Sequence, residues 1–242
     1  MSVSIDPNDN PQREHAWNVF PYPCIGQFRF CDLSIGIHAL YPEILSRMKT
    51  GNETYLDLGC CFGQDIRRLV KDGAPSENFY GSDLRLDFME LGYDLFLDKD
   101  TLKSKFIEGD VFDPDSKLKA LEGQIDILHA AAFFHLFGLE DQKKIARRVV
   151  KLLKPEKNSL LVGRQVGNTT PGVFPHRTNP AENMFRHNVE SWRQMWNEIG
   201  EETGTQWEVD GELLDWPGVQ TGAIPSWQNQ GARRLQFSVR RK

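Results

Sequence analysis

Residues 54–65, TYLDLGCCFGQD, constrain the fold of this 242-residue chain more than any other stretch. A short apolar run ends at Leu58, glycines follow at Gly59 and Gly63, and residues 64–70 have the composition of a helix. A strand, a glycine-bearing turn and a helix in this order form the first unit of a doubly wound α/β sheet, with a ligand site at the carboxyl end of the strand. Glycine suits that turn because a residue without Cβ lets backbone approach a ligand or adopt a positive φ.

The spacing and charge of this turn favour a nucleoside ligand that carries no phosphate. Its glycines follow the pattern G-x-x-x-G, not the G-x-G-x-x-G of dinucleotide folds. Asp57, at the end of the strand, would repel a pyrophosphate bound at the turn and would suit a ligand with an ammonium group. S-adenosylmethionine (SAM) has an α-ammonium and a sulfonium and no phosphate. An ordinary turn after a buried strand, with Asp57 as a capping residue, remains the alternative from these residues alone.

The run LDLGCCFGQDIRRLVKDGAP resembles motif I of class I SAM-dependent methyltransferases. With YPCIGQFRF, YGSDL, ELGYDLF, FFHLF and VGRQVG, the chain is similar, from about Tyr22 to its end, to the fungal O-methyltransferases of meroterpenoid biosynthesis. The resemblance implies a Rossmann-like α/β fold, a mostly parallel seven-stranded sheet flanked by helices, with SAM as the cofactor. One departure is Cys61, which stands where the wider superfamily has a middle glycine, so the path of the cofactor loop is open.

The ends of successive strands supply the candidate cofactor residues. Residues 78–83 form a second short strand whose final Asp83 lies 20 residues beyond Gly63, where an acid accepts hydrogen bonds from ribose hydroxyls or caps the next helix. For the strand and turn 105–112, the resemblance implies that Asp110 meets the adenine amino group and that the N–H of Val111 meets a ring nitrogen; a plain acidic turn is the alternative. The predicted cofactor-binding residues are Asp57, Gly59, Cys60, Gly63, Asp83, Leu84, Asp110, Val111, Phe112 and Ala130.

Two residues are candidates for the chemistry at the methyl acceptor. His135 follows the fourth strand, residues 124–130, and would act as general base if the acceptor is a phenol, whose pKa is about 10. Arg164, at the end of the fifth strand, residues 159–165, would pair with a carboxylate acceptor. The alternatives are a pocket-lining or helix-start histidine and a surface ion pair.

The N-terminal 50 residues are expected to be a flexible end followed by an aromatic lid or cap, and residues 51–242 the SAM-binding domain. Aromatic residues and prolines fill residues 15–41, which favours either a satellite of the core or a lid over the acceptor. The predicted acceptor-binding residues are Trp17, Phe20, Tyr22, Phe134, Gln165 and His187. The remaining histidines, His129 among them, show no local pattern and are expected to be structural or on the surface.

The rest of the chain alternates helices and strands, which predicts a single α/β domain. Helices are expected at residues 41–48, 87–97, 139–153 and 188–199, and strands at residues 206–214 and 235–239. Residues 166–183 are rich in Pro, Gly, Thr and Asn, which predicts a loop bordering the acceptor.

Composition excludes several classes of function. The net charge is −5 and no basic stripe occurs, which argues against a nucleic-acid partner. No apolar run approaches the roughly 20 residues that span a bilayer, the polar N-terminus is not a secretory signal, and the cysteines form no zinc pattern. We therefore expect a cytoplasmic SAM-dependent O-methyltransferase that acts on a small apolar molecule bearing a carboxylate or hydroxyl, most simply by esterifying a carboxylic acid of secondary metabolism. A methyltransferase fold repurposed as a cyclase or binding scaffold is the main alternative.

Overall fold

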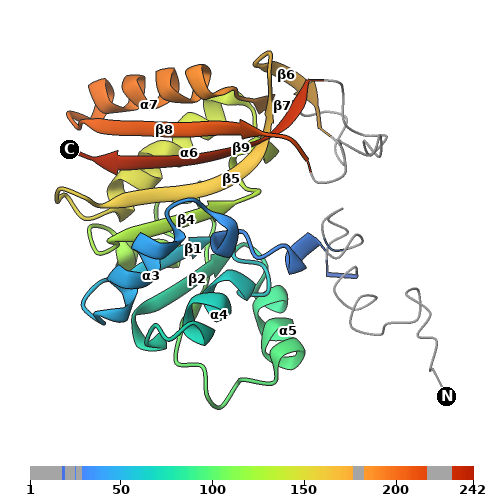
Figure 1. Ribbon diagram of the computed structural model, residues 1–242, viewed down its shortest axis with the longest axis vertical. Coiled ribbons are helices and arrows are strands. Elements are labelled where there is room, and N and C mark those ends of the chain that lie inside the picture. The colour runs from blue at the N-terminus through green and yellow to red at the C-terminus, as the bar shows by residue number, and fades with distance from the viewer. Residues whose placement is uncertain (1–17, 20–24, 26–28, 177–182, 217–230) are drawn as a thin grey trace.

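The computed structural model describes residues 18–19, 25, 29–176, 183–216 and 231–242. A seven-stranded sheet runs through them in the order β3-β2-β1-β4-β5-β9-β8, flanked by helices (Figure 1). Strands β1 to β5 are parallel, whereas β9 is antiparallel to both of its neighbours. This confirms the predicted fold class. The strands of this sheet are β1 (Tyr55–Leu58), β2 (Phe79–Asp83), β3 (Lys105–Glu108), β4 (Ile127–Ala131), β5 (Leu160–Asn168), β8 (Trp207–Leu214) and β9 (Ala232–Arg241).

The helices connect these strands and cover both faces of the sheet. Each helix expected from the sequence is present; α7 extends furthest beyond its expected end, to Thr203. Figure 1 shows α7 lying beside β8, and α3 and α4 lying near β1. The helices are α3 (Tyr41–Lys49), α4 (Gln64–Lys71), α5 (Leu86–Phe96), α6 (Leu139–Leu152) and α7 (Val189–Thr203), with 3₁₀ turns η1 (Arg29–Cys31), η2 (Ile35–Ile37), η3 (Ser76–Asn78), η4 (Lys117–Leu121) and η5 (Phe134–Leu136).

Alternation along the central strands determines which face each side chain occupies. Tyr55 and Ile127 pack with α3 and α4 in one buried cluster, whereas Leu56 and Leu128 pack with α6 and α7 in the other. Because side chains alternate along a strand, residues two positions after the first pair return to the α3/α4 face. That face therefore carries Asp57 on β1 and His129 on β4. It also carries Arg164 on β5, which lies two positions after Val162 of the same cluster.

The prediction of a loop over residues 166–183 is wrong for the described part of that segment. Strand β5 continues to Asn168, because its pairing with β9 extends to Asn168 opposite Ala232. A two-stranded antiparallel sheet follows, formed by β6 (Gly172–Pro175) and β7 (Asn183–Arg186). The N–H of Phe185 donates to the carbonyl oxygen of Phe137 at 2.9 Å, which fixes β7 against the turn after η5.

Residues 32–40, here called the strap, cross the α3/α4 face before α3 begins. The Ile35 side chain is fully buried in the core cluster of that face. His38 donates from Nε2 to the carbonyl oxygen of Phe237 at 3.0 Å, and its Nδ1 accepts from the N–H of Leu40 at 3.1 Å. The strap is thus part of the core. Trp17, Phe20 and Tyr22 lie outside the described residues, so the expected lid remains a prediction.

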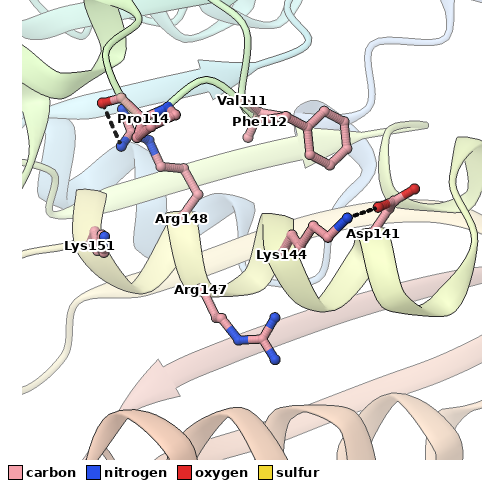
Figure 2. Close-up of a pocket in the computed structure, with 8 residues that line it drawn as sticks. All are labelled: Val111, Phe112, Pro114, Asp141, Lys144, Arg147, Arg148 and Lys151. Atoms are coloured by element: carbon pink, nitrogen blue, oxygen red, sulfur yellow. Dashed lines mark hydrogen bonds and ion pairs between the residues drawn. The ribbon is translucent and has the colours of Figure 1, made fainter.

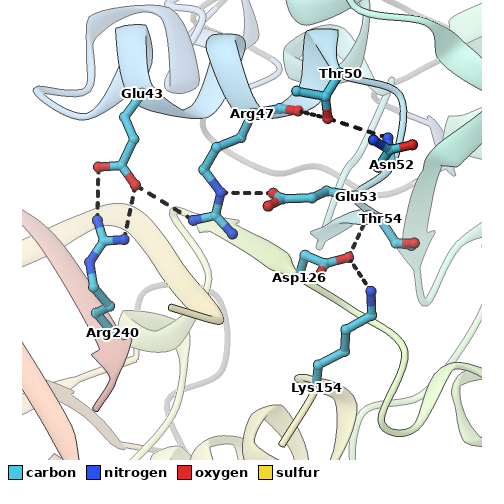
Figure 3. Close-up of polar contacts among 9 residues, drawn as sticks. All are labelled: Glu43, Arg47, Thr50, Asn52, Glu53, Thr54, Asp126, Lys154 and Arg240. Carbon is cyan, nitrogen blue, oxygen red and sulfur yellow. Dashed lines mark hydrogen bonds and ion pairs between the residues drawn. The ribbon is translucent and has the colours of Figure 1, made fainter. Parts of the chain in front are cut away.

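Ion pairs connect the elements at the end of the sheet where the parallel strands begin (Figure 3). Both oxygens of Glu43 accept from Arg240 at 2.9 Å, which ties α3 to β9. Asp126, just before β4, accepts from the N–H of Thr54 and from Nζ of Lys154, each at 2.7 Å. A hollow of about 420 Å³ lies beside these groups, at the end of the sheet where the parallel strands begin. Across the described ranges, no helix has the length and apolarity needed to cross a membrane.

Candidate cofactor and acceptor site

The loop between β1 and α4 has a left-handed backbone at three alternate residues. Gly59, Cys61 and Gly63 have φ values of 74°, 50° and 67°. The N–H groups of Gly59 and Cys60 both donate to the carbonyl oxygen of Ser82, at 2.8 and 3.0 Å, which anchors the loop to the end of β2. Cys61 therefore adopts the positive φ that a glycine would adopt most easily.

Asp83 connects this loop to the end of β2. Its Oδ2 accepts from the N–H of Cys61 at 2.9 Å, and its Oδ1 accepts from the N–H of Arg85 at 3.1 Å. Burial raises the pKa of Asp83, and the two backbone donors oppose that rise. Each carboxylate oxygen has a further lone pair, so the carboxylate retains capacity for ribose hydroxyls.

Two exposed apolar side chains mark the ends of β2 and β3. Leu84, directly after Asp83, is 57% exposed, and Phe112 is 40% exposed. Between them in sequence, Asp110 accepts from the N–H of Phe112 at 2.8 Å and thereby shapes the turn after β3, while Val111 is largely buried. Exposed apolar side chains at neighbouring strand ends are the kind of surface that a flat heterocycle such as adenine can cover.

Val111 and Phe112 also border a groove of about 470 Å³ along α6 (Figure 2). Its other lining residues are mostly cationic, and several are paired: Lys144 with Asp141, Arg147 with Glu202, and Arg148 with Glu122. The remaining predicted cofactor residues do not line this groove. The groove therefore adjoins two of the predicted cofactor residues and not the others.

Asp57 is buried beneath the loop, where its partner is a histidine that sequence analysis did not select. Asp57 and His129 lie directly opposite each other on β1 and β4, and Nδ1 of His129 lies 2.8 Å from Oδ1 of Asp57. The side chains are 3% and 1% exposed. The pairing of His129 with Asp57 depends on the register of two strands whose residues are 72 positions apart in sequence. A local sequence pattern does not reveal that register.

The segment after β4 brings Phe133, not Phe134, to the loop. A Cβ on Gly59 would lie 2.6 Å from Cδ2 of Phe133, so that ring packs directly on the glycine. Ala130 is buried at the end of β4. Phe134 is fully buried, with its ring centroid 5.1 Å from that of Trp192 and 6.2 Å from that of Phe237. The packing therefore places Phe134 in the core and makes Phe133 the candidate contact for an acceptor.

Arg164 binds the strap through much of its guanidinium. Its Nε donates to Oγ of Ser34 at 2.6 Å, and its Nη2 donates to the carbonyl oxygen of Asp32 at 2.9 Å. Burial lowers the pKa of Arg164, and the carboxylates of Asp65 and Asp32 oppose that shift. These contacts give Arg164 a role in holding the strap, whatever it does toward an acceptor.

The other acceptor candidates lie around η5, β5 and β7. His135 is half-buried in η5. Gln165 is 2% exposed, and neither atom of its amide has a hydrogen-bond partner among the described residues. His187 is also buried; its Nδ1 lies 2.9 Å from Oγ of Ser191, and burial lowers its pKa to about 4. His187 is therefore neutral near pH 7 and offers hydrogen bonds but no charge.

Two family models match the chain. One describes a methyltransferase domain and matches residues 56–156. The other describes the N-terminal domain of meroterpenoid methyltransferases and matches residues 11–31.

Several fungal enzymes are similar along most of their length. The O-methyltransferase phiE of a fungal species is 44% identical over 95% of this chain and 80% of its own. The methyltransferase adrK of Penicillium roqueforti is 46% identical over 82% of this chain and 71% of its own. The asnovolin E/chermesin D methyltransferase nvfJ of Aspergillus novofumigatus is 43% identical over 86% of this chain and 76% of its own.

Solved structures share the fold at low sequence identity. Phosphoethanolamine N-methyltransferase 2 of Haemonchus contortus, solved with SAM, is 12% identical with a TM-score of 0.58, and the match covers 96% of this chain and 60% of that one. The [4+2]-cyclase SpnF is 14% identical with a TM-score of 0.56 over 82% of this chain and 78% of that one. At such identities the likeness shows the class I methyltransferase fold alone.

Proposed function

Because the chain belongs to the family of fungal meroterpenoid methyltransferases, and is thus a SAM-dependent methyltransferase, we propose that it methylates a carboxylate oxygen of a small terpenoid–polyketide acid. The product would be a methyl ester. The observation that supports a cofactor beside the left-handed loop is the set of carboxylates at or just after the carboxyl ends of β1, β2 and β3, Asp57, Asp83 and Asp110.

These residues fit the cofactor by charge and by shape. Oδ2 of Asp57 is buried and has no hydrogen-bond partner in the described part of the chain, so it lacks the donor that a buried carboxylate needs. Asp57 would face the cationic methionine end, Asp83 the ribose, and Asp110 with Val111 the adenine. The backbone of Gly59, Cys60 and Gly63 would approach the cofactor closely. The side chains of Leu84 and Phe112 would pack against it, and the small side chain of Ala130 would leave room for it. When bound, SAM supplies an electrophilic methyl group on a sulfonium.

A carboxylate acceptor would need little from the protein beyond orientation. A carboxylic acid, with a pKa of about 4, is already an anion near pH 7, whereas a phenol, with a pKa of about 10, needs a base. The unpartnered amide of Gln165 offers N–H groups to a carboxylate, and the neutral His187 offers hydrogen bonding without a competing charge. His135 would then line the site, and Arg164 would act mainly by holding the strap, with its remaining N–H groups available to the anion.

A single substrate can distinguish a carboxylate from a phenol acceptor. A farnesylated hydroxybenzoic acid offers both groups, and mass spectrometry with product hydrolysis identifies the one that is methylated. We expect the ester, a rate that is flat from about pH 6 to 9, and a loss of less than about tenfold in His135→Ala. Gln165→Leu should raise the acceptor KM more than it lowers kcat, because it removes uniform binding.

The alternative of a phenol acceptor predicts a different pattern. Removal of a histidine base would cost about 10²–10⁴ in rate, and the wild-type rate would fall below about pH 6.5 as His135 protonates. An ether product with that acidic limb would refute the ester proposal. SAM binding without transfer to any acid or phenol would instead favour a repurposed scaffold or cyclase.

A further inference from the structure

Three ionisable side chains meet in the core between the strap and the cofactor loop. Asp57 on β1, Asp65 in the first turn of α4 and His129 on β4 each offer an atom within 4.8 Å of the other two. All three residues are at most 2% exposed. Two carboxylates this close and this deeply buried repel each other unless a cation or a proton lies between them.

Two hydrogen bonds connect this cluster to the strap on one side and to the end of β1 on the other. The N–H of Ile35, in the strap, donates to Oδ1 of Asp65 at 2.8 Å. Nδ1 of His129 lies 2.8 Å from Oδ1 of Asp57, so an N–H there orients that carboxylate. Nε2 of His129 is buried and has no hydrogen-bond partner among the residues that the structure describes. Hydrogen bonds therefore join Ile35 to Asp65 and His129 to Asp57, and the two pairs are linked by the charges of Asp65 and His129, which lie within 4.8 Å of each other.

We propose that Asp65 and His129 are positioning residues that couple the seating of the strap to cofactor binding through Asp57. This inference rests on the proposed function only in assigning Asp57 to the cofactor. When the strap is packed on the sheet, the Ile35 N–H donates to Asp65 and favours its ionised form. The ionised carboxylates of Asp65 and Asp57 together favour the protonated, imidazolium form of His129. That imidazolium fixes one oxygen of Asp57 and leaves Oδ2 for the ligand.

Electrostatics agree with this arrangement. The carboxylates of Asp57 and Asp65 raise the pKa of His129 against the effect of its burial, which alone would lower it. Burial raises the pKa of Asp65 to about 6, whereas His129, the Ile35 N–H and Arg164 oppose the rise. Loss of the strap would remove the Ile35 donor and loosen Arg164, which is held by Ser34. Asp65 would then be easier to protonate, and His129 would lose one of its two anionic neighbours.

A bound metal ion is the competing explanation for such a cluster. The short contact between Nδ1 of His129 and Oδ1 of Asp57 suits a shared proton. Metal ligands would instead point their lone pairs at a common centre. Added Zn²⁺ or Mn²⁺ should therefore leave the melting temperature unchanged. A rise that disappears in His129→Asn would assign the cluster to a metal and overturn the proposal.

The test is a double-mutant cycle read by calorimetry with S-adenosylhomocysteine, the demethylated cofactor. Asp65→Asn removes the charge but keeps the acceptor for Ile35, and His129→Asn keeps a donor near Asp57 but breaks the connection to Asp65. We expect each variant to weaken binding about tenfold and the double variant to be no weaker than either, because the residues act as one unit. In methyl-transfer assays the KM for SAM should rise while kcat at saturating SAM changes by less than about threefold.

Amide hydrogen exchange supplies a second readout, independent of activity. S-adenosylhomocysteine should slow exchange in strap residues 32–38 of the wild-type protein but not in His129→Asn. Val149→Ala, in the core on the other face, is the matched control: it should lower the melting temperature and leave ligand affinity and strap protection unchanged. Folded Asp65→Asn and His129→Asn proteins that bind within twofold of wild type, or whose effects multiply, would overturn the coupling. Asp57→Asn with wild-type affinity would instead refute the assignment of Asp57 to the cofactor.

Discussion

Cys61 shows how much strain one residue of the cofactor loop carries. A non-glycine residue in the left-handed region costs roughly 1–2 kcal/mol, yet Cys61 holds φ = 50° there because its N–H is bound by Asp83 and the loop is anchored to β2. Glycine would remove that strain but would lose about 0.5–1 kcal/mol through the greater freedom of the unfolded chain. The two effects nearly cancel.

We therefore expect Cys61→Gly to change the free energy of unfolding by less than about 1 kcal/mol, and Cys61→Val to destabilise the fold by about 2 kcal/mol or more. Urea unfolding measures both. Ala132, with φ = 52°, is the matched position, and Ala132→Gly should behave like Cys61→Gly. A Cys61→Val protein as stable as wild type would show that the loop relaxes out of the left-handed region.

At this scale the sequence predicts the positions of strand-end residues but not their partners. Asp57, Asp83 and Asp110 could be placed because the carboxyl ends of parallel strands meet at one edge of a sheet. His129 could not, because its role depends on register with β1, and a single buried strand has no pattern that reveals it. Phe133 and Phe134 are adjacent and identical in type, and the bend after β4 turns their rings in different directions. The sequence alone therefore does not indicate which of the two rings packs in the core.

At the scale of elements, the hairpin β6–β7 is the feature that sequence analysis missed. Its strands are only four residues each, with Gly, Pro and Asn at their ends, so neither length nor alternation marks them. The hairpin is fixed from outside: Nε2 of Gln142, on α6, donates to the carbonyl oxygens of Phe137 and Phe185 at 2.9 and 2.8 Å. A hydrogen bond from one distant buried amide leaves no pattern in the sequence of β6 and β7. The seven strands of the main sheet, by contrast, have apolar patterns of their own and could be predicted.

We expect Gln142→Leu to destabilise the protein by about 1–3 kcal/mol, because two carbonyl oxygens lose a buried donor. Exchange of the Phe185 amide should rise by more than exchange in β1 or β4, since the loss is local to β7. Gln194→Leu, on the exposed side of α7, removes an amide that donates to Glu198 on the same helix and serves as the control with little expected effect. Equal destabilisation by both variants would contradict the anchoring role.

At the scale of the whole molecule, buried histidines make the fold sensitive to acid. Burial lowers the pKa of His38 and of His187 to about 4, whereas an unfolded histidine has a pKa of about 6.5. Between these values the unfolded chain binds more protons than the folded one, so stability is present above about pH 6.5 and is lost as pH falls toward 4. Each histidine accounts for about 3 kcal/mol over that interval.

Groups whose pKa is raised act in the opposite direction, and Asp65 is the one with the largest stated shift. The pKa of Asp65 is raised to about 6 in the folded protein, so its contribution is present below its unfolded pKa, near 3.8, and is lost as pH rises through 6. Acidification from pH 7 to 4 therefore gains about 3 kcal/mol at Asp65 and loses about twice that at the two histidines. For these three groups together the net loss is about 3 kcal/mol. The raised pKa values of Asp83 and His129 oppose that loss, whereas the depressed pKa values of Glu43 and Glu198 add to it.

Urea midpoints measured at pH 7.5, 6, 5 and 4.5 test this balance. The wild-type midpoint should fall steadily below pH 6.5, and His38→Gln and His187→Gln should each start lower at pH 7.5 but decline less steeply, because each variant removes one proton-binding group from the unfolded chain. Protonation of His38 must also break the bond from the Leu40 N–H to Nδ1, so the strap should lose amide protection before the rest of the sheet. A midpoint that stays constant from pH 7.5 to 5 would show that both imidazoles remain accessible to protons in the folded state.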